Sequence, residues 1–221
     1  MVLVGEYSEE EALKFQGVLP KNKGFKRSVP LNNKERKAIA ECTAIVAEGF
    51  PQLAVSHRIN LSGLNRMELE YLNIILGHGT RSRLSQRLRE EKGMVYSIAS
   101  TLKGNDIIIS YSINPPFLTE AIADVQDVLE ELSVRAIQQE EFERAKGVLL
   151  HRYYRSLEDY RVLANIYSVY SELDSWERTL KARFGIEWTD IAQPIQITGH
   201  QILVTGDPKY WQTWYDSCTD K

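Results

Sequence analysis

Mainly apolar and mainly polar positions alternate between Leu53 and Leu61. One face of this segment would carry Leu53, Val55, His57, Ile59 and Leu61, and the other Ala54, Ser56, Arg58 and Asn60. An alternation with a period of two is typical of a strand that is buried on one face only. The segment therefore predicts a half-buried β-strand.

A second alternating pattern predicts a β-hairpin. The stretch "MVYSIASTLKGNDIIISYSI", which begins at Met94, contains two such runs around Gly104-Asn105-Asp106. Glycine and asparagine favour the positive backbone angles of tight hairpin turns. The pair Pro115-Pro116 would end the second strand, because proline lacks the amide that a strand ladder needs.

Helical patterns surround these strands. The stretch "NRMELEYLNIILGHG" is amphipathic and closes on Gly77 and Gly79, and a short helix from Ser82 to Glu91 is expected to lead into Gly93. From Phe117 to about Leu173 the chain is predicted to be mostly helical, because apolar residues recur there at helical spacing. The first of them are Ile122, Val125, Val128, Leu129 and Leu132.

The N-terminal part is harder to interpret. Val2–Val4 and the stretch from Ser8 predict a strand and a helix, and Leu19–Lys34, which is rich in proline and basic residues, predicts a linker. The following stretch, "ERKAIAECTAIVAEGFPQ", has the Ala and Glu content of a helix but could equally be one arm of a hairpin. Near the other end, Gln201–Asp207 predicts an apolar strand.

Composition narrows the class of protein. The 221 residues are 43% hydrophobic and 26% charged with a net charge of -3, which argues against a nucleic-acid-binding protein. We expect no membrane span and no secretory signal, because no apolar stretch is long enough and glutamates interrupt the start. Cys42 and Cys218 are too few for a disulfide framework and are expected to be buried or idle thiols. These observations favour the cytoplasm, although a strand directly after Met1 would also fit a piece of a longer protein.

Candidate chemistry is sparse. The four histidines, His57, His78, His151 and His200, lie far apart, and neither they nor the cysteines have the spacing of zinc ligands. We expect each histidine to be structural or exposed to solvent. Neither cysteine has the neighbours of a nucleophile, and the glycine-rich stretch after Leu76 is too short for a phosphate loop.

The most suggestive stretch is "RLSQRLREEKGMVYSIAS", from Arg83 to Ser100, in which basic residues precede a glycine and then a tyrosine. Gly93 would let the chain turn sharply, so that Arg89 at a helix end and Tyr96 at a strand start converge. A guanidinium and a phenol together could hold a peptide. The alternative is that Arg89 pairs with a neighbouring glutamate on the surface and Tyr96 lies in the core.

The order of these residues resembles the pitrilysin/insulinase family of zinc metallopeptidases. The matching block is "ILGHGTRSRLSQRLREEKGMVYS", and "EEFERAK" (Glu140–Lys146) resembles a second family stretch. "VLVGEYSEEEALKF" is similar to the segment that joins the two homologous halves of these enzymes. In the family one half carries zinc on an H-x-x-E-H helix, and the other offers an arginine and a tyrosine to the substrate.

The resemblance implies that this chain is the half without zinc. The positions that would match the zinc helix are Glu70, Tyr71, Leu72, Asn73 and Ile74, and no histidine is among them. Arg89 and Tyr96 match the substrate-binding pair. The implied fold is α+β, with an antiparallel sheet and helices packed on one face. Residues 1–22 would join the chain to a preceding homologous half, and residues 23–221 would form the inactive-type peptidase domain.

The function implied is that of a substrate-binding, non-catalytic half of a zinc metallopeptidase, which hydrolyses peptides in a chamber between two homologous halves. No cofactor is expected in this chain, and zinc is expected on the partner half. The expected partners are that half and a peptide substrate. A homodimer is kept as an alternative. The alternative is a structural or peptide-binding subunit of the same fold without a proteolytic role. The resemblance also favours strand over helix at Thr43–Glu48, paired antiparallel with Leu53–Leu61.

Overall fold

The computed structural model describes residues 40–156, 158–169, 178, 180–182 and 184–219. They fall into two compact units: the larger contains described residues 40–148 and 186–219, and the smaller contains those between 149 and 185. The strand, helix and linker predicted before residue 35, and the proposed boundary at residue 22, lie outside the described residues.

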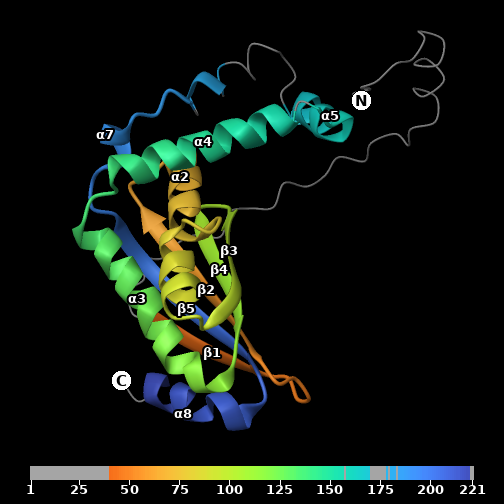
Figure 1. Ribbon diagram of the computed structural model, residues 1–221, viewed down its shortest axis with the longest axis vertical. Coiled ribbons are helices and arrows are strands. Elements are labelled where there is room, and N and C mark those ends of the chain that lie inside the picture. The colour runs from red at the N-terminus through yellow and green to blue at the C-terminus, as the bar shows by residue number, and fades with distance from the viewer. Residues whose placement is uncertain (1–39, 157, 170–177, 179, 183, 220–221) are drawn as a thin grey trace, which may run out of the picture. The chain divides into compact units, whose positions relative to one another are not determined.

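The larger unit is built on a five-stranded sheet (Figure 1). Its strands are β1 (Ala40–Val46), β2 (Leu53–Ser62), β3 (Val95–Lys103), β4 (Asp106–Ile113) and β5 (Gln196–Gly206). They lie in the order β1-β5-β2-β4-β3. The strand predicted at Leu53–Leu61 and the hairpin around Gly104 are therefore confirmed, and the ambiguous stretch "ERKAIAECTAIVAEGFPQ" is a strand over Ala40–Val46.

The pairing predicted for that strand was wrong. β1 does not pair with β2 but runs parallel to β5, which lies between them and is antiparallel to β2. The physical reason is burial. β5 brings the buried Ile202 and Val204 to the centre of the sheet, whereas the end of β1 leaves Ile45 and Val46 exposed. A central place favours the strand that can bury more apolar surface.

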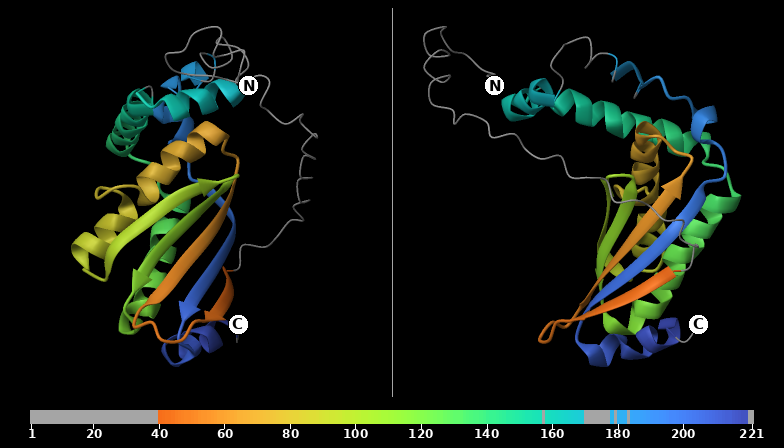
Figure 2. Two further views of the ribbon diagram at one scale, coloured as in Figure 1. Left: turned by 90° about the vertical axis from the view of Figure 1, so that its right-hand side faces the viewer. Right: turned by 180° about the vertical axis from the view of Figure 1, so that it is seen from behind.

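Helices cover one face of this sheet. They are α2 (Arg66–Gly77), α3 (Leu118–Val134) and the start of α4 (Gln139–Ser156), with the shorter η1 (Ser85–Glu91), η2 (Pro115–Phe117), α7 (Trp188–Ile191) and α8 (Pro208–Thr219) around them. Seen from behind, the sheet lies in front of α2 and α3, and its near face carries no described helix (Figure 2). The predicted α+β fold is thus confirmed, with one parallel strand pair added. The smaller unit contains the end of α4 and α5 (Tyr160–Val169).

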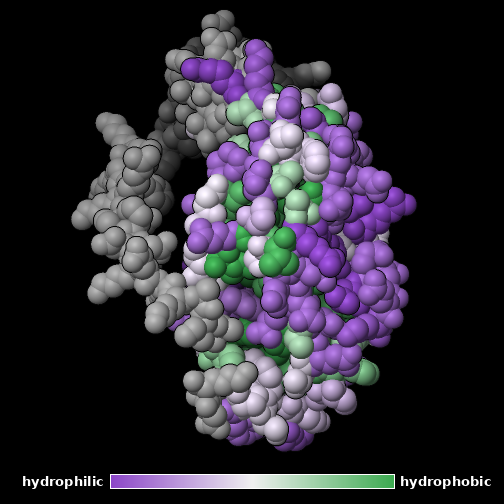
Figure 3. Space-filling model, turned by 90° about the vertical axis from the view of Figure 1, so that its left-hand side faces the viewer, coloured by the Kyte–Doolittle hydropathy of each residue, from purple (hydrophilic) through white to green (hydrophobic). Residues whose placement is uncertain are grey.

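The core of the larger unit lies between the sheet and these helices. Ile59 on β2, Leu72 on α2 and Val125 on α3 are all fully or almost fully buried there. The face drawn in Figure 3 is mainly hydrophilic, and its hydrophobic residues appear as small islands among hydrophilic ones. The apolar positions of the sequence therefore serve mostly to join the two layers.

The closest approach between the layers is at Gly77, the last residue of α2. A Cβ atom added there would lie 2.6 Å from the Cβ of Ser100 on β3. One turn earlier on the same helix, Asn73 accepts a 2.5 Å hydrogen bond from the Ser100 hydroxyl. Both groups are buried, so this contact fixes α2 against β3 without leaving either polar side chain unsatisfied.

The cysteines are not thiols, contrary to the sequence-based prediction. Cys42 on β1 and Cys218 on α8 form a disulfide, with their Cα atoms 6.3 Å apart. The sequence offered no sign of it, because the two residues are 176 positions apart. Disulfides persist mainly in oxidising compartments, so this bond removes one ground for the cytoplasmic prediction.

Two of the histidines form a buried polar chain. His57 on β2 bonds through Nδ1 to Nε2 of His200 on β5, at 3.0 Å, and through Nε2 to the hydroxyl of Tyr111 on β4, at 2.9 Å. Burial, and then the nearby His200, hold the pKa of His57 well below its usual value. Burial also lowers the pKa of His200, to about 4. Both rings are therefore neutral near pH 7, as expected for structural histidines.

We expect the substitution Gly77→Ala to lower the free energy of unfolding by about 1–3 kcal/mol, because the new methyl group would overlap the backbone-anchored Cβ of Ser100. Chemical denaturation would measure this loss. Gly147→Ala is the matched control, since Gly147 lies inside α4 and nothing lies within 4 Å of an added Cβ. That control should raise stability slightly, by up to about 1 kcal/mol. Equal losses at both glycines would contradict this packing.

We also expect stability to fall as the pH is lowered from 6.5 towards 4. The unfolded chain binds protons on His57 and His200 in this window, while the folded chain, with both pKa values depressed, does not. Each histidine can contribute a slope of up to about 1.4 kcal/mol per pH unit. Denaturation between pH 7 and pH 5 would measure it. His200→Asn should flatten the slope, whereas the exposed His151, replaced by Asn, should leave it unchanged.

Candidate functional site

The helix that carries Arg89 is anchored from below by apolar side chains. η1 spans Ser85–Glu91 with the wider turns of a π-helix, and Leu84 and Leu88 on its inner side are fully buried. Turns of this kind are rare and occur often at functional sites. The predicted short helix is confirmed, and its exposed side holds Arg89.

The same helix is held laterally by ion pairs to α3 and α4. The pairs are Arg83 with Glu141 (2.8 Å for each of two bonds), Arg87 with Glu131 (3.2 Å), and Lys92 with Glu120 and Asp124 (2.9 Å each). Three basic residues of the stretch from Arg83 to Ser100 therefore hold the helix in place. In the described residues, Arg89, and Arg81 two positions before the stretch, make no bond to α3 or α4.

The ion pair between Arg83 and Glu141 is the strongest of the set, since its geometry is bidentate and both side chains are largely buried. The hydrogen bond to Glu141 raises the pKa of Arg83. Burial alone would raise the pKa of Glu141, but the bonds from Arg83 and from the Gln138 amide outweigh it and lower that pKa. Both groups therefore stay charged, and the start of η1 is tied to α4.

A sharp turn brings the end of η1 next to the start of β3. Gly93 has φ +62°, a left-handed conformation that glycine adopts at little cost. Its N–H donates to the carbonyl of Arg89 (3.0 Å), and the N–H of Met94 donates to that of Leu88 (2.9 Å). The turn predicted at Gly93 is confirmed, and it places Arg89 and Tyr96 on neighbouring elements.

A β-bulge then turns Tyr96 away from the core. β3 pairs with β4 through Val95↔Ile113 and Ile98↔Tyr111, so Tyr96 and Ser97 face a single residue of β4. Beyond the bulge, Ser100 is buried under α2. In a regular strand Tyr96 would share the side of Ser100 and point inward, because side chains alternate. Bulges redirect side chains in this way and are frequent beside active sites.

Arg89 and Tyr96 lie together on the surface. The Arg89 Cζ atom is 6.0 Å from the centre of the Tyr96 ring, the Tyr96 residue is 91% exposed, and the Arg89 side chain is 43% exposed. The prediction that they lie near each other without burial is confirmed. The alternative that placed Tyr96 in the core is wrong. Arg89 does also contact Glu90, at 3.6 Å, but an exposed pair of this kind contributes little energy.

This pair offers complementary donors to a peptide. The guanidinium presents several N–H groups in a plane, and the phenol adds an O–H donor and a flat apolar ring. Such groups can hold a peptide carbonyl or a terminal carboxylate. An aromatic side chain this exposed gains almost nothing from burial, so its position is not explained by the stability of the fold.

The helix positions that would carry zinc in the other half are occupied differently here. Tyr71 is fully buried and stacks on Phe142 of α4, with ring centres 4.9 Å apart. The side chain of Asn73 accepts a hydrogen bond from the Ser100 hydroxyl. Within the described residues, no group of three or more His, Cys, Asp or Glu side chains could hold a metal ion. Nor does any described helix have the length and apolar character needed to cross a membrane.

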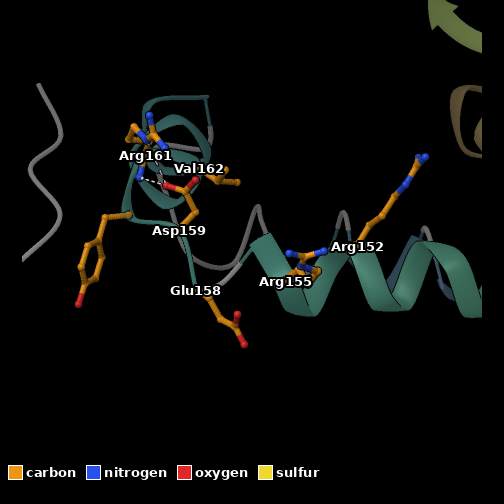
Figure 4. A pocket seen from close by; sticks show the side chains of 7 residues that line it. Arg152, Arg155, Glu158, Asp159, Arg161 and Val162 are labelled. Atoms are coloured by element: carbon orange, nitrogen blue, oxygen red, sulfur yellow. Dashed lines mark hydrogen bonds and ion pairs between the residues drawn. The ribbon is translucent and has the colours of Figure 1, made fainter.

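A wide hollow in the smaller unit is a weaker candidate for a ligand-binding site. It is lined by Arg152, Arg155, Glu158, Asp159, Tyr160, Arg161 and Val162. Arg161 is paired with Asp159 at 3.5 Å. Figure 4 shows Arg152 extending away from Arg155 and from Arg161, so the three guanidiniums do not converge on one point. This hollow therefore lacks the geometry of a single anion site.

Comparison with known proteins places the chain in a family. Residues 1–149 match the family described as the peptidase M16 inactive domain. The chain belongs to this family. It is the family whose resemblance the sequence suggested. No curated protein matches the chain.

Solved structures share the fold of this M16 inactive-type domain. A peptidase M16 inactive domain from Pseudomonas fluorescens is 18% identical with a TM-score of 0.69, over 90% of this chain and 50% of that one. The periplasmic protease PqqL from Escherichia coli is 16% identical with a TM-score of 0.61, over 92% and 24%. A chain of Complex III2 from Candida albicans is 15% identical with a TM-score of 0.65, over 98% and 56%. The M16 domain thus spans about half the length of the first of these structures.

Proposed function

We propose that this M16 inactive-type domain is the substrate-binding, non-catalytic half of a zinc peptidase, and that Arg89 and Tyr96 contact the peptide. The observation that carries the proposal is the exposed pair itself, 6.0 Å apart at a bulge and a glycine turn. A homologous half would supply the zinc, and hydrolysis would take place between the two halves.

The roles of the two residues follow from their chemistry. Zinc on the partner half would activate water and polarise the scissile carbonyl. The Tyr96 hydroxyl would donate a hydrogen bond to the oxygen on which negative charge develops. The Arg89 guanidinium would hold peptide carbonyls before and during the reaction, and its weak contact with Glu90 leaves it available for this.

A structural role is the second candidate. A chain of Complex III2 from Candida albicans has the same fold, which supports the idea that the fold can serve inside an assembly. In that case, the domain would pair with a homologous chain without any proteolysis. The exposure of Tyr96 favours the peptidase, because a purely structural subunit has no need for an exposed aromatic ring at this bulge.

The test is kinetic, with the zinc-carrying half supplied. Tyr96→Phe should lower kcat with little change in KM, because its hydroxyl would act on charge that appears in the transition state. Arg89→Ala should raise KM as well. Each loss should be on the order of 10²-fold, by analogy with the removal of one oxyanion donor. The exposed Tyr154 and Arg135, replaced by Phe and Ala, are controls that should keep full activity.

Two results would overturn the proposal. Full activity of both the Tyr96 and Arg89 variants would reduce the pair to ordinary surface residues. A stable complex that never cleaves peptides would favour the structural role instead. Metal analysis of the dialysed chain by itself is a further check, since one tightly held zinc ion per chain would mean that this half is not the inactive type.

A further inference from the structure

A second site candidate lies at the other end of the arginine-rich stretch. A crevice of about 220 Å³ opens between the last turn of α2, the loop after it, and α4. Ile74 and Ile75 of α2 form an almost fully buried apolar floor, and Val148 of α4 adds to it. Arg81, Arg144 and Glu141 stand around it.

The carboxylate in this crevice, that of Glu141, already accepts several hydrogen bonds. Glu141 accepts one hydrogen bond from Arg83 on each oxygen, at 2.8 Å, and one more from the Gln138 amide, at 2.9 Å. The lowered pKa of Glu141 reflects these bonds. Glu141 also attracts Arg144 electrostatically, so its one carboxylate faces the guanidiniums of Arg83, Arg144 and the nearby Arg81 and cannot neutralise all three.

Arg81 and Arg144 make no side-chain hydrogen bond or ion pair in the described part of the chain, although the Glu141 carboxylate attracts Arg144 at longer range. Arg144 lies three positions after Glu141 on α4, so both side chains emerge from the same helical face. The crevice therefore combines an apolar floor with two arginines whose charge the single, already bonded Glu141 does not balance.

The adjoining hollow provides a contrast. It has a volume of about 360 Å³ and shares Arg81 and Glu141 with the crevice. Its other basic side chains, Arg83 and Arg87, are paired with Glu141 and Glu131. Glu91 also lines the hollow, so three guanidiniums face three carboxylates there. The crevice has two guanidiniums and one carboxylate, so a ligand anion would be drawn to the crevice.

We propose that this crevice binds the C-terminal carboxylate of a peptide whose last residue is apolar. Two arginine forks match a carboxylate, and the isoleucine floor matches an aliphatic side chain. The volume is below the roughly 300–1,000 Å³ of sites for drug-sized ligands, which suits a chain end and not a longer segment. The identity of the ligand as a peptide rests on the proposed function, but the site does not involve Arg89 or Tyr96.

The test uses a short probe, the peptide acetyl-Ala-Ala-Ala-Leu, as a free acid and as a C-terminal amide. Binding to the full chain would be measured by calorimetry and by amide chemical shifts of the residues that line the crevice. The acid should bind at least about 10-fold more tightly than the amide, because a charge-assisted hydrogen bond contributes that much or more. Arg81→Gln and Arg144→Gln should each lower the affinity for the free-acid peptide about 10-fold. Arg135→Gln, an exposed control, should not change this affinity.

Further arms separate the alternatives. Octanoate tests a free aliphatic carboxylate, and tighter binding of octanoate than of the peptide would overturn the assignment to a peptide end. Equal binding of acid and amide, or equal effects of the Arg81 and Arg135 variants, would overturn the site. The exposed Tyr154, replaced by Phe, should leave probe binding unchanged. The chemical shifts are read at the crevice residues and need no zinc half, so a failure here is distinguishable from a failure of the kinetic test.

Discussion

The close contact between α2 and β3 at Gly77 and Ser100 is the constraint on which the rest of the site depends. Because a Cβ at Gly77 would lie 2.6 Å from that of Ser100, α2 can approach β3 this closely only with a residue at position 77 that has no side chain. The contact fixes which side of β3 faces the core. With Ser100 turned inward, Tyr96 could not reach the surface if β3 were regular, and the bulge between Val95 and Ile98 resolves this conflict.

The arginine-rich stretch divides its charges between two tasks. Arg83, Arg87 and Lys92 tie η1 to the neighbouring helices, and this rigid attachment positions the remaining two arginines. Preorganised groups bind with a smaller loss of conformational entropy. A stretch that looks uniformly basic in sequence is thus partly structural and partly available to ligands, and only the positions of its acidic partners tell the two parts apart.

Local patterns predicted the elements of this fold but not the long-range pairings. The alternation from Leu53, the turn at Gly104 and the glycine at Gly93 all determine backbone geometry within a few residues, and they were confirmed. The parallel pairing of β1 with β5 and the bond between Cys42 and Cys218 join residues far apart in the chain, and no local pattern encodes them. The bulge at Tyr96 carries no glycine that could have revealed it. The family resemblance identified Arg89 and Tyr96. Nothing in the local sequence singles out Arg144, because its role depends on the hydrogen bonds between Glu141 and Arg83.

The place of β5 in the sheet has a consequence for how the chain folds. β5 lies between β1 and β2, which are separated by only a short loop, although it comes more than 130 residues after β2. Within the part of the chain that the structure describes, β1 therefore has no partner strand during synthesis until residues near Gly206 have emerged from the ribosome. Until then one side of β2 presents unpaired backbone amides and carbonyls, which is the state in which strands associate with other chains. A chain shortened before Gln196 would lose the centre of its sheet and not merely an edge.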